Sequence, residues 1–289
     1  MLTLKAEIIK NNPMIKKKAL VIIKGGLGNQ LFQLSLCNKL ITMGYDVYID
    51  YSFYVNKEWM LNNTKRELEL DLENLDFKIA TKKTLSIFYN LQKLRPISNY
   101  QKGHNLNISN TKFFNIFDGY WQTVENLEFS IDYVVNLLST YPKFSNYLNN
   151  NRKKGSTLVH IRRTDYVDLS QELSLQYYVD ALNLAKSTVN NFYYDIFTDD
   201  VEWISENELF KDARNVFDRN SFGGSSLDTF FEMLDYENYI ISNSTFSFLA
   251  AFIGKRQNST LIKPYPWFYD REHNFDNITN WINIDWKYI

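Results

Sequence analysis

The sequence predicts an α/β protein made of two Rossmann-like halves, and three observations lead to this prediction. Short apolar runs rich in β-branched residues recur along the chain, and most end at glycine or polar residues, as buried parallel strands do. Segments of helical length with amphipathic spacing lie between these runs. The alternation stops at residues 138–154, which are rich in Asn and Lys and contain Pro142, and then starts again. We therefore expect one domain at residues 14–150 and a second at residues 151–289.

The N-terminal half opens with a strand, a helix and a second strand. Residues 19–24 form a short β-branched run that ends in glycine, which predicts a buried strand. Residues 29–43 carry apolar side chains at helical spacing, and Gly44 is placed to end this helix. Asp46–Asp50 predicts the next strand. A βαβ unit of this kind implies a parallel sheet with right-handed crossovers. Residues 51–110 give no clear prediction.

The C-terminal half repeats the alternation. Its expected strands are residues 158–161, 192–198, 239–242 and 260–262. Its expected helices are residues 175–186, 227–234 and 245–252. Three tryptophans near the end of the chain are expected in irregular or helical structure: Trp267, Trp281 and Trp286.

Composition narrows the classes of protein. Of the 289 residues 45% are hydrophobic and 16% aromatic, which is ample for two ordinary cores. A formal net charge of −1 gives no general attraction to nucleic acid. The single cysteine, Cys37, excludes an internal disulfide and suits a reducing compartment.

No apolar run reaches the ~20 residues of a membrane-spanning helix. Residues 1–13 lack the apolar core of a signal peptide, and we expect them to form a disordered or non-native leader. The basic cluster at residues 16–18 is expected to be a solvated strand entrance, with contact to an anionic membrane surface as the alternative.

Two motifs carry candidate chemistry. Residues 20–33 read LVIIKGGLGNQLFQ, which is a strand, a glycine-rich turn and the start of a helix. Residues 157–166 read TLVHIRRTDY, in which an apolar strand ends in His-x-Arg-Arg-x-Asp. Guanidinium groups form planar forks that match phosphate oxygens. The loop after a parallel strand is also where open α/β sheets bind ligands. The second motif therefore indicates a diphosphate site, with two surface arginines, one paired with Asp165, as the alternative.

Four motifs in one order resemble the α-1,2-fucosyltransferases of bacteria, glycosyltransferase family 11. The glycine turn and the His-x-Arg-Arg-x-Asp strand end are followed by FTDD at residues 197–200 and SNSTFS at residues 242–247. The match runs from Ile22 to about Gly254, and the combination is specific. Phe248 follows the last motif where many family members have tryptophan, which leaves the acceptor open.

The resemblance implies the GT-B architecture, in which two Rossmann-like domains face each other across a cleft. The first domain would face the acceptor and the second would hold the nucleotide sugar. The implied reaction is inverting transfer of L-fucose from GDP-β-L-fucose to O2 of a terminal β-galactoside, in the synthesis of a surface glycan such as O-antigen. The alternatives are a fucosyltransferase of α-1,6 or O-fucosyl regiochemistry, and a non-catalytic sugar-binding or nucleotide-binding protein of the same fold.

The implied partners are GDP-fucose and a galactose-containing oligosaccharide or lipid-linked glycan, without nucleic acid. The setting is cytoplasmic, with at most peripheral contact at the inner face of the plasma membrane. We expect no cofactor and no metal, because the adjacent carboxylates Asp199 and Asp200 do not form Asp-x-Asp. The three histidines, His104, His160 and His273, are also far apart in the sequence.

Arg162 is the principal catalytic candidate, because it is expected to hold the departing diphosphate as negative charge develops. Asn29, after the glycine turn, and Asp165 are the other catalytic candidates, with Asp168 as an alternative base. Asp165 is equally expected as the structural partner of Arg163. Contacts with the nucleotide sugar are expected from Gly26, Gly28, His160, Arg163, Asp199, Asp200, Ser244, Thr245 and Phe246.

Several of these residues also have a purely structural interpretation. His160 is either a nucleotide contact or a core histidine at a strand end. Asp199 and Asp200 are expected to bind guanosine, or else to cap the helix that follows. Ser244 and Thr245 are expected to cap a helix and to bind phosphate, and the two roles are compatible.

Two further stretches have structural alternatives. The three glycines of the turn, Gly25, Gly26 and Gly28, are expected to allow positive φ and close approach to the donor. Tyr120, Trp121 and Gln122 are expected to line a sugar site or, equally, to fill the core.

Overall fold

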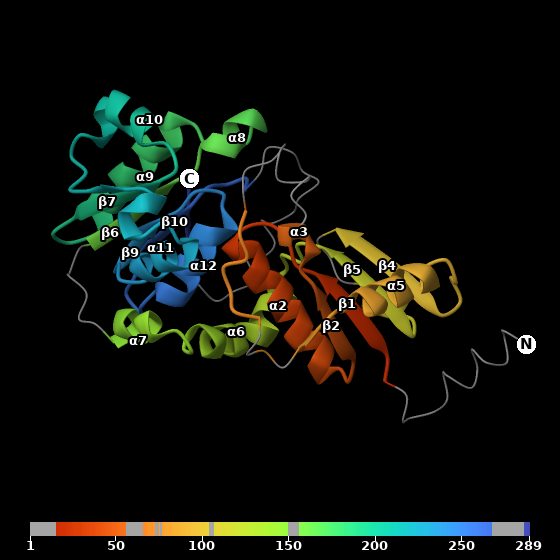
Figure 1. Cartoon of the computed structure of the whole chain (residues 1–289). Coiled ribbons are helices and arrows are strands. Elements are labelled where there is room, and N and C mark those ends of the chain that lie inside the picture. The colour runs from red at the N-terminus through yellow and green to blue at the C-terminus, as the bar shows by residue number, and fades with distance from the viewer. Residues whose placement is uncertain are drawn as a thin grey trace, which may run out of the picture. The chain divides into compact units, whose positions relative to one another are not determined.

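The computed structural model describes residues 16–55, 66–72, 75, 77–103, 107–149, 156–267 and 286–289 (Figure 1). The leader expected at residues 1–13 and the expectation for Trp281 fall outside these ranges. The chain divides into two compact units, Met1–Val134 and Val135–Ile289, whereas the sequence suggested a boundary after residue 150.

The first unit contains a five-stranded parallel sheet in the order β3-β2-β1-β5-β4. Its strands are β1 (Lys18–Ile22), β2 (Asp46–Asp50), β3 (Lys78–Ile79), β4 (Ser98–Gly103) and β5 (Phe114–Gly119). Its helices are α2 (Leu27–Thr42), α3 (Ser52–Val55), α5 (Lys82–Leu91) and the short 3-10 helix η1 (Ile108–Asn110). Helix α6 (Val124–Leu138) crosses the boundary between the units.

The expected βαβ start is confirmed, with β1 and β2 parallel and α2 between them. Helix α2 begins at Leu27, slightly earlier than expected, and Gly44 follows its end with a φ of 84°. Helix α5 packs on the face of the sheet that carries Leu20 and Ile116, through its buried residue Phe88.

Trp121 is a core residue. Its side chain is 0% exposed, and its ring meets Phe117 edge-on at a centroid distance of 5.7 Å. Its backbone is left-handed, with a φ of 53°, so the chain turns sharply after β5 and carries the indole inward. The interpretation of Trp121 as a sugar platform is therefore wrong, while Tyr120 and Gln122 remain partly exposed.

The second unit contains a six-stranded parallel sheet in the order β11-β10-β9-β6-β7-β8. Its strands are β6 (Ser156–Ile161), β7 (Tyr193–Thr198), β8 (Val216–Phe217), β9 (Asn238–Ile240), β10 (Leu261–Lys263) and β11 (Trp286–Tyr288). Numbered within the unit, this is the 3-2-1-4-5-6 order of Rossmann folds. The α/β class with two Rossmann-like units is confirmed.

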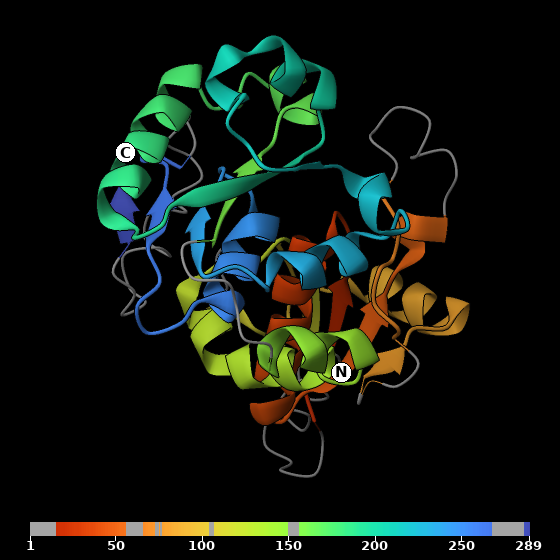
Figure 2. The same ribbon diagram turned by 90° about the vertical axis from the view of Figure 1, so that its left-hand side faces the viewer.

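Helices cover both faces of this sheet (Figure 2). The helices of the unit are α7 (Pro142–Asn149), α8 (Thr164–Asp168), α9 (Leu175–Thr188), α10 (Val201–Glu206), α11 (Ser226–Met233) and α12 (Thr245–Gly254). Two 3-10 helices, η2 (Glu208–Phe210) and η3 (Arg219–Phe222), connect them. Helix α9 packs on the face that carries Val159, Ile196 and Ile240. On the opposite face the Tyr239 hydroxyl bonds to the carbonyl of Leu234, at the end of α11.

Two expectations for this half are wrong. The segment taken as a linker contains α7, which packs Phe144 and Tyr147 against Phe231 of α11 at centroid distances of 5.7 and 6.4 Å. Trp286 lies in β11 rather than in irregular or helical structure. Trp267 is irregular, as expected, and buried.

Candidate active site

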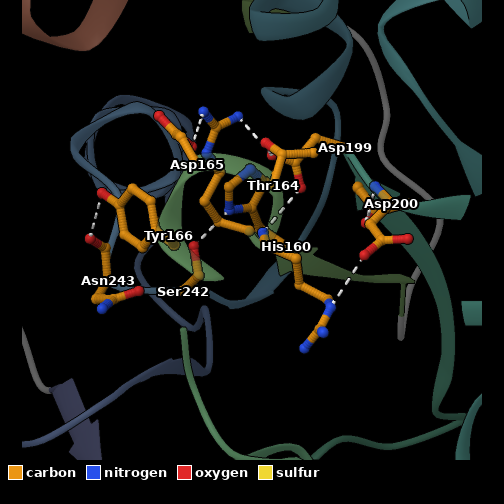
Figure 3. Close-up of polar contacts among 11 residues, drawn as sticks. His160, Thr164, Asp165, Tyr166, Asp199, Asp200, Ser242 and Asn243 are labelled. Carbon is orange, nitrogen blue, oxygen red and sulfur yellow. Dashed lines mark hydrogen bonds and ion pairs between the residues drawn. The ribbon is translucent and has the colours of Figure 1, made fainter. Parts of the chain in front are cut away.

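Strands β6 and β9 form the point where the strand order of the second sheet reverses. From β6 the chain moves outward to β7 and β8, and from β9 it moves in the other direction to β10 and β11. Ligands of open α/β sheets bind outside the carboxyl ends of the strands at such a point. The His-x-Arg-Arg-x-Asp segment begins in the last two residues of β6 and continues into the loop after it, and the Ser-Asn-Ser-Thr segment follows β9. The topology therefore brings these two motifs together (Figure 3).

His160 and Ser242 connect the two strand ends directly. The His160 Nδ1 atom lies 2.7 Å from the Ser242 hydroxyl oxygen, and both residues are buried. Burial lowers the pKa of His160 from its ordinary value of 6.5 to about 3. Asp199 opposes this shift and the positive charge of Arg162 adds to it. The imidazole is therefore neutral at physiological pH and joins β6 to β9 without adding charge.

The neutral state of His160 predicts a pH dependence of stability. Between pH 6.5 and about 3 the unfolded chain binds a proton at His160 that the folded chain excludes. The free energy of unfolding therefore falls as the pH falls through this window, by up to about 1.4 kcal/mol per pH unit from this residue. We expect His160→Asn, which keeps a polar atom near the Nδ1 position, to flatten the decline. Urea unfolding between pH 4 and 7 measures how the free energy of unfolding changes with pH. An equal change per pH unit in the variant and the unmodified protein would contradict the expectation.

Arg162 is held by two carboxylates. Its Nη1 atom lies 2.7 Å from Oδ2 of Asp199, and its Nη2 atom pairs with Oδ1 of Asp165. Its guanidinium also lies over the Tyr166 ring, at 5.7 Å from the centroid. Only 17% of the Arg162 side chain is exposed, so Arg162 is a fixed cation at the carboxyl end of β6 rather than a mobile surface charge.

Arg163 has different partners from those expected. Its Nε atom donates to Oδ2 of Asp200 at 3.1 Å, and its guanidinium stacks 4.1 Å from the centroid of the Trp203 ring. The expected pair between Arg163 and Asp165 is therefore wrong, because Asp165 lies in the first turn of α8 and pairs with Arg162.

Asp199 organises the loop after β6. Besides pairing with Arg162, it accepts hydrogen bonds from the Arg163 amide at 2.9 Å and from the Thr164 hydroxyl at 2.5 Å. Asp200 caps α10 by accepting from the Trp203 amide at 3.0 Å, which confirms the capping alternative for that residue. Contact of either carboxylate with guanosine stays a prediction.

The start of α12 lies beside the same strand ends. Ser244 occupies the N-cap position, but its side chain makes no capping hydrogen bond. Thr245 and Phe246 are the first helical residues, and the Phe246 ring lies 6.1 Å from the His160 ring. The first amides of a helix, with the helix dipole, favour an anion at this position.

The glycine turn lies in the first unit, between β1 and α2. Only Gly25 has the expected positive φ, at 83°; Gly26 is the extended N-cap of α2 with a φ of −80°, and Gly28 is helical. A Cβ atom on Gly25 would lie 2.6 Å from Nδ2 of Asn29, so a larger residue would also have to displace that side chain. The expectation of positive φ is wrong for Gly26 and Gly28.

Polar residues of the same motif fix this turn. Gln33, which is fully buried, accepts from the Lys24 amide at 3.0 Å and donates to the Gly119 carbonyl at 3.0 Å. It therefore joins the carboxyl ends of β1 and β5, the neighbouring strands where the order of the first sheet reverses. Asn29 is partly exposed and accepts from Nε2 of Gln122 at 2.7 Å.

An ion pair at the carboxyl ends of β1 and β5 was not predicted from the sequence. Lys24 Nζ lies 2.5 Å from Oδ1 of Asp118, and the Tyr100 hydroxyl donates to Oδ2. The Lys24 ammonium also lies 5.3 Å from the centroid of the Tyr120 ring. The sequence contained one indication of this pair: Lys24 and Asp118 each lie between the end of an apolar run and a glycine.

The candidate residues are divided between the units. Gly26, Gly28 and Asn29 belong to the first unit. The other candidates belong to the second unit: His160, Arg162, Arg163, Asp165, Asp199, Asp200, Ser244, Thr245 and Phe246. Asp168, the alternative base, is exposed at the end of α8.

Two kinds of feature are absent from the residues that the structure describes. Within them, no three His, Cys, Asp or Glu side chains are grouped in a way that could hold a metal ion. No helix in those ranges combines the length and the apolar character needed to cross a bilayer.

The fold and the position of the site are typical of an α/β enzyme that binds its ligand beyond the carboxyl ends of a parallel sheet. The chain belongs to glycosyl transferase family 11, whose profile matches residues 97–289. It is therefore a glycosyltransferase of the fucosyltransferase-like kind, and its two Rossmann-like units are those of the GT-B class.

Two Escherichia coli proteins are similar over most of their length. An alpha-1,2-colitosyltransferase is 26% identical and aligns over 91% of this chain and 97% of its own. The O-antigen biosynthesis glycosyltransferase WbnK is 24% identical over 91% of this chain and 99% of its own. Among solved structures, NodZ alpha-1,6-fucosyltransferase from Bradyrhizobium shares 15% identity, over 82% of this chain and 92% of that one, with a TM-score of 0.45. A TM-score this low does not support transfer of function.

Proposed function

We propose that this chain transfers L-fucose from GDP-β-L-fucose to O2 of a terminal β-galactoside, with inversion at the donor carbon. The observation that carries the proposal is the position of Arg162. It is a fixed, largely buried cation beyond β6, where the strand order reverses, and the first turn of α12 follows the neighbouring strand β9.

The departing diphosphate is the chemical demand that this arrangement meets. Negative charge grows on the diphosphate as its bond to the sugar breaks, and preorganised donors stabilise it without further rearrangement. Asp165 and Asp199 fix the plane of the Arg162 guanidinium, which has five N–H donors to share between them and phosphate oxygens. The first amides of α12 supply neutral donors of the same polarity.

The remaining candidates then take distinct roles. Neutral His160 holds β6 and β9 together, and Asp199 positions the loop that carries both arginines. Asp165 is already paired with Arg162, which favours a positioning role over that of a general base. The first unit, with Asn29 beside the glycine turn, serves the acceptor hydroxyl.

The similar proteins support two finer points and raise a second candidate. One of them is named as an α-1,2-transferase, and the other is named for O-antigen biosynthesis. We therefore propose O-antigen or a related surface glycan as the product. Colitose is 3-deoxy-L-fucose, so the first of these names also makes transfer of colitose the second candidate function.

A donor and product assay decides between these functions. Purified protein is supplied with GDP-fucose or its 3-deoxy analogue, together with lactose, lacto-N-biose or the T-antigen disaccharide. We expect fucose transfer, with NMR showing an α-linkage to O2 of galactose. If only the 3-deoxy donor is turned over, the transferred sugar is colitose and not fucose. Attachment to O3, O4 or O6, or a β-linkage, would contradict the regiochemistry, and absence of transfer from both donors would remove the proposal.

We also propose that no divalent cation takes part, because Arg162 supplies the positive charge that a metal would otherwise provide. Transfer is expected to proceed unchanged in EDTA. A loss of activity in chelator that Mn²⁺ or Mg²⁺ restores would overturn this proposal and assign Asp199 or Asp200 a metal-binding role.

A further inference from the structure

Charge is unevenly distributed in the first unit. Residues 77–117 contain seven Lys or Arg residues and no Asp or Glu, although the whole chain has 32 basic and 33 acidic residues. Segregation of this kind indicates an interaction with an anionic partner. The seven cations are Lys78, Lys82, Lys83, Lys93, Arg95, Lys102 and Lys112.

Two of these cations lie where positive charge destabilises a helix. Lys82 and Lys83 open α5, where the helix dipole disfavours positive charge. The same helix has no acidic residue in its first turn and no basic residue in its last turn. Helix stability would favour the reverse arrangement, so the two lysines point to a role outside the helix.

Helix α5 presents these lysines to solvent. Its inner face packs Phe88 against Tyr48 and Phe114. Its outer face carries Lys82 and Lys83 together with Ile87, whose side chain is 43% exposed. An apolar side chain thus lies among the cations.

The basic side chains continue past the end of α5. Lys93, Leu94 and Arg95 are exposed in the turn that follows, with Leu94 at 39% exposure. The chain then enters β4, where the Phe114 amide bonds to the Ile97 carbonyl at 2.9 Å. This pairing brings the segment of exposed Lys112, just before β5, to the same sheet edge as Arg95.

We define the basic surface as the exposed residues along α5 and beyond its end: Lys82, Lys83, Ile87, Lys93, Leu94, Arg95 and Lys112. Throughout the part of the chain that the structure describes, none of its five cations pairs with a carboxylate. By contrast, Lys18 and Lys78 share the carboxylate of Asp46.

We propose that the basic surface binds an anionic phospholipid bilayer. Cations attract the headgroups, while Ile87 and Leu94 enter the boundary between headgroups and acyl chains. Ile87 and Leu94 favour lipid over nucleic acid, because aliphatic side chains enter the acyl boundary of a bilayer. The exposed aromatic residue of α5, Tyr89, instead holds its hydroxyl on Asp50. The proposal stands on the charge and exposure of the first unit and does not depend on the identity of the donor or acceptor.

Vesicle flotation of the full chain tests this surface. The protein should float with vesicles that contain phosphatidylglycerol and not with pure phosphatidylcholine, and added salt should weaken the binding. Each cation contributes about fivefold to affinity at such a surface. Two double variants should therefore each weaken binding by roughly 25-fold or more. One carries Lys82→Glu with Lys83→Glu, and the other carries Lys93→Glu with Arg95→Glu. Activity on a soluble acceptor should not change.

The control is Lys186→Glu with Lys211→Glu, which reverses two exposed lysines of the second unit, one of them paired with Glu208. It should bind vesicles like the unmodified protein. The variant Ile87→Ser with Leu94→Ser keeps every charge and should also lose affinity for the vesicles. Absence of binding to anionic vesicles, equal binding to neutral ones, or equal loss in the control would overturn the proposal. Binding of polyuridylate in preference to vesicles would overturn it as well.

Discussion

Replacement of Arg162 by alanine is expected to reduce transfer by about 100-fold or more while the protein remains folded. Removing a single preorganised donor from a site of developing charge typically has an effect of this size. Arg162→Lys should restore little activity, because an ammonium group is a point charge and cannot form the planar fork that the guanidinium offers to two oxygens.

The measurement is release of GDP from the donor in the presence of acceptor, with thermal unfolding to check the fold. Arg219→Ala is a suitable control, since it removes an exposed arginine after the edge strand β8, two strands away from β6. Near-normal turnover in Arg162→Ala, or an equal loss in Arg219→Ala, would end the assignment of Arg162 as the group that stabilises the diphosphate.

Gly119→Ala is expected to have the largest effect on stability. A Cβ atom at this position would lie 1.9 Å from the carbonyl oxygen of Gly103 and 2.9 Å from its carbonyl carbon. Both are backbone atoms of the paired strand β4, so β4 and β5 would have to separate locally. We expect the free energy of unfolding to fall by about 3 kcal/mol or more, as in severe overpacking.

Gly26→Ala provides the contrast. A Cβ atom on Gly26 would meet nothing closer than Nη1 of Arg66 at 3.9 Å, and its φ of −80° suits any residue. Urea unfolding should show a change within about 0.5 kcal/mol for this variant. Equal stability losses in the two variants would show that contact between β4 and β5 is not the reason for glycine at position 119.

The regular parts of the fold could be predicted because local pattern and tertiary position agree in them. Strand β2 has the expected bounds, and β6 and α12 differ from expectation only at their ends. The shortest elements were missed, because two-residue edge strands such as β3 and β8 carry no periodicity. Helix α7 was missed because Pro142 was taken as a linker signal, whereas proline is common at the first position of a helix.

The candidate site could be predicted as a set of residues but not as a set of pairs. The motifs indicated Arg162, Asp165 and Asp199, and the structure brings all three together. The pairing depends on α8, whose first turn carries Asp165 back toward Arg162, a residue that lies just before the N-cap of the helix. It also depends on the register of β7 against β6, which pairs Ile161 with Thr198 and so sets Asp199 beside the arginine.

The core position of Trp121 was beyond sequence analysis for a different reason. A left-handed backbone at a bulky residue is rare, and no local pattern predicts it. The Lys24–Asp118 pair was missed because its members are far apart in the sequence and meet only when β1 and β5 become neighbours. Such contacts follow from strand order, which the sequence indicated only at the level of the βαβ unit.

A crystal structure of the full chain with GDP tests the central claim most directly. The account predicts the diphosphate at the carboxyl ends of β6 and β9, with its oxygens on the Arg162 guanidinium and the first amides of α12. The competing position is the glycine turn before α2, which also ends at the N-terminus of a helix. A diphosphate bound at that turn, with Arg162 still held only by Asp165 and Asp199, would contradict the account.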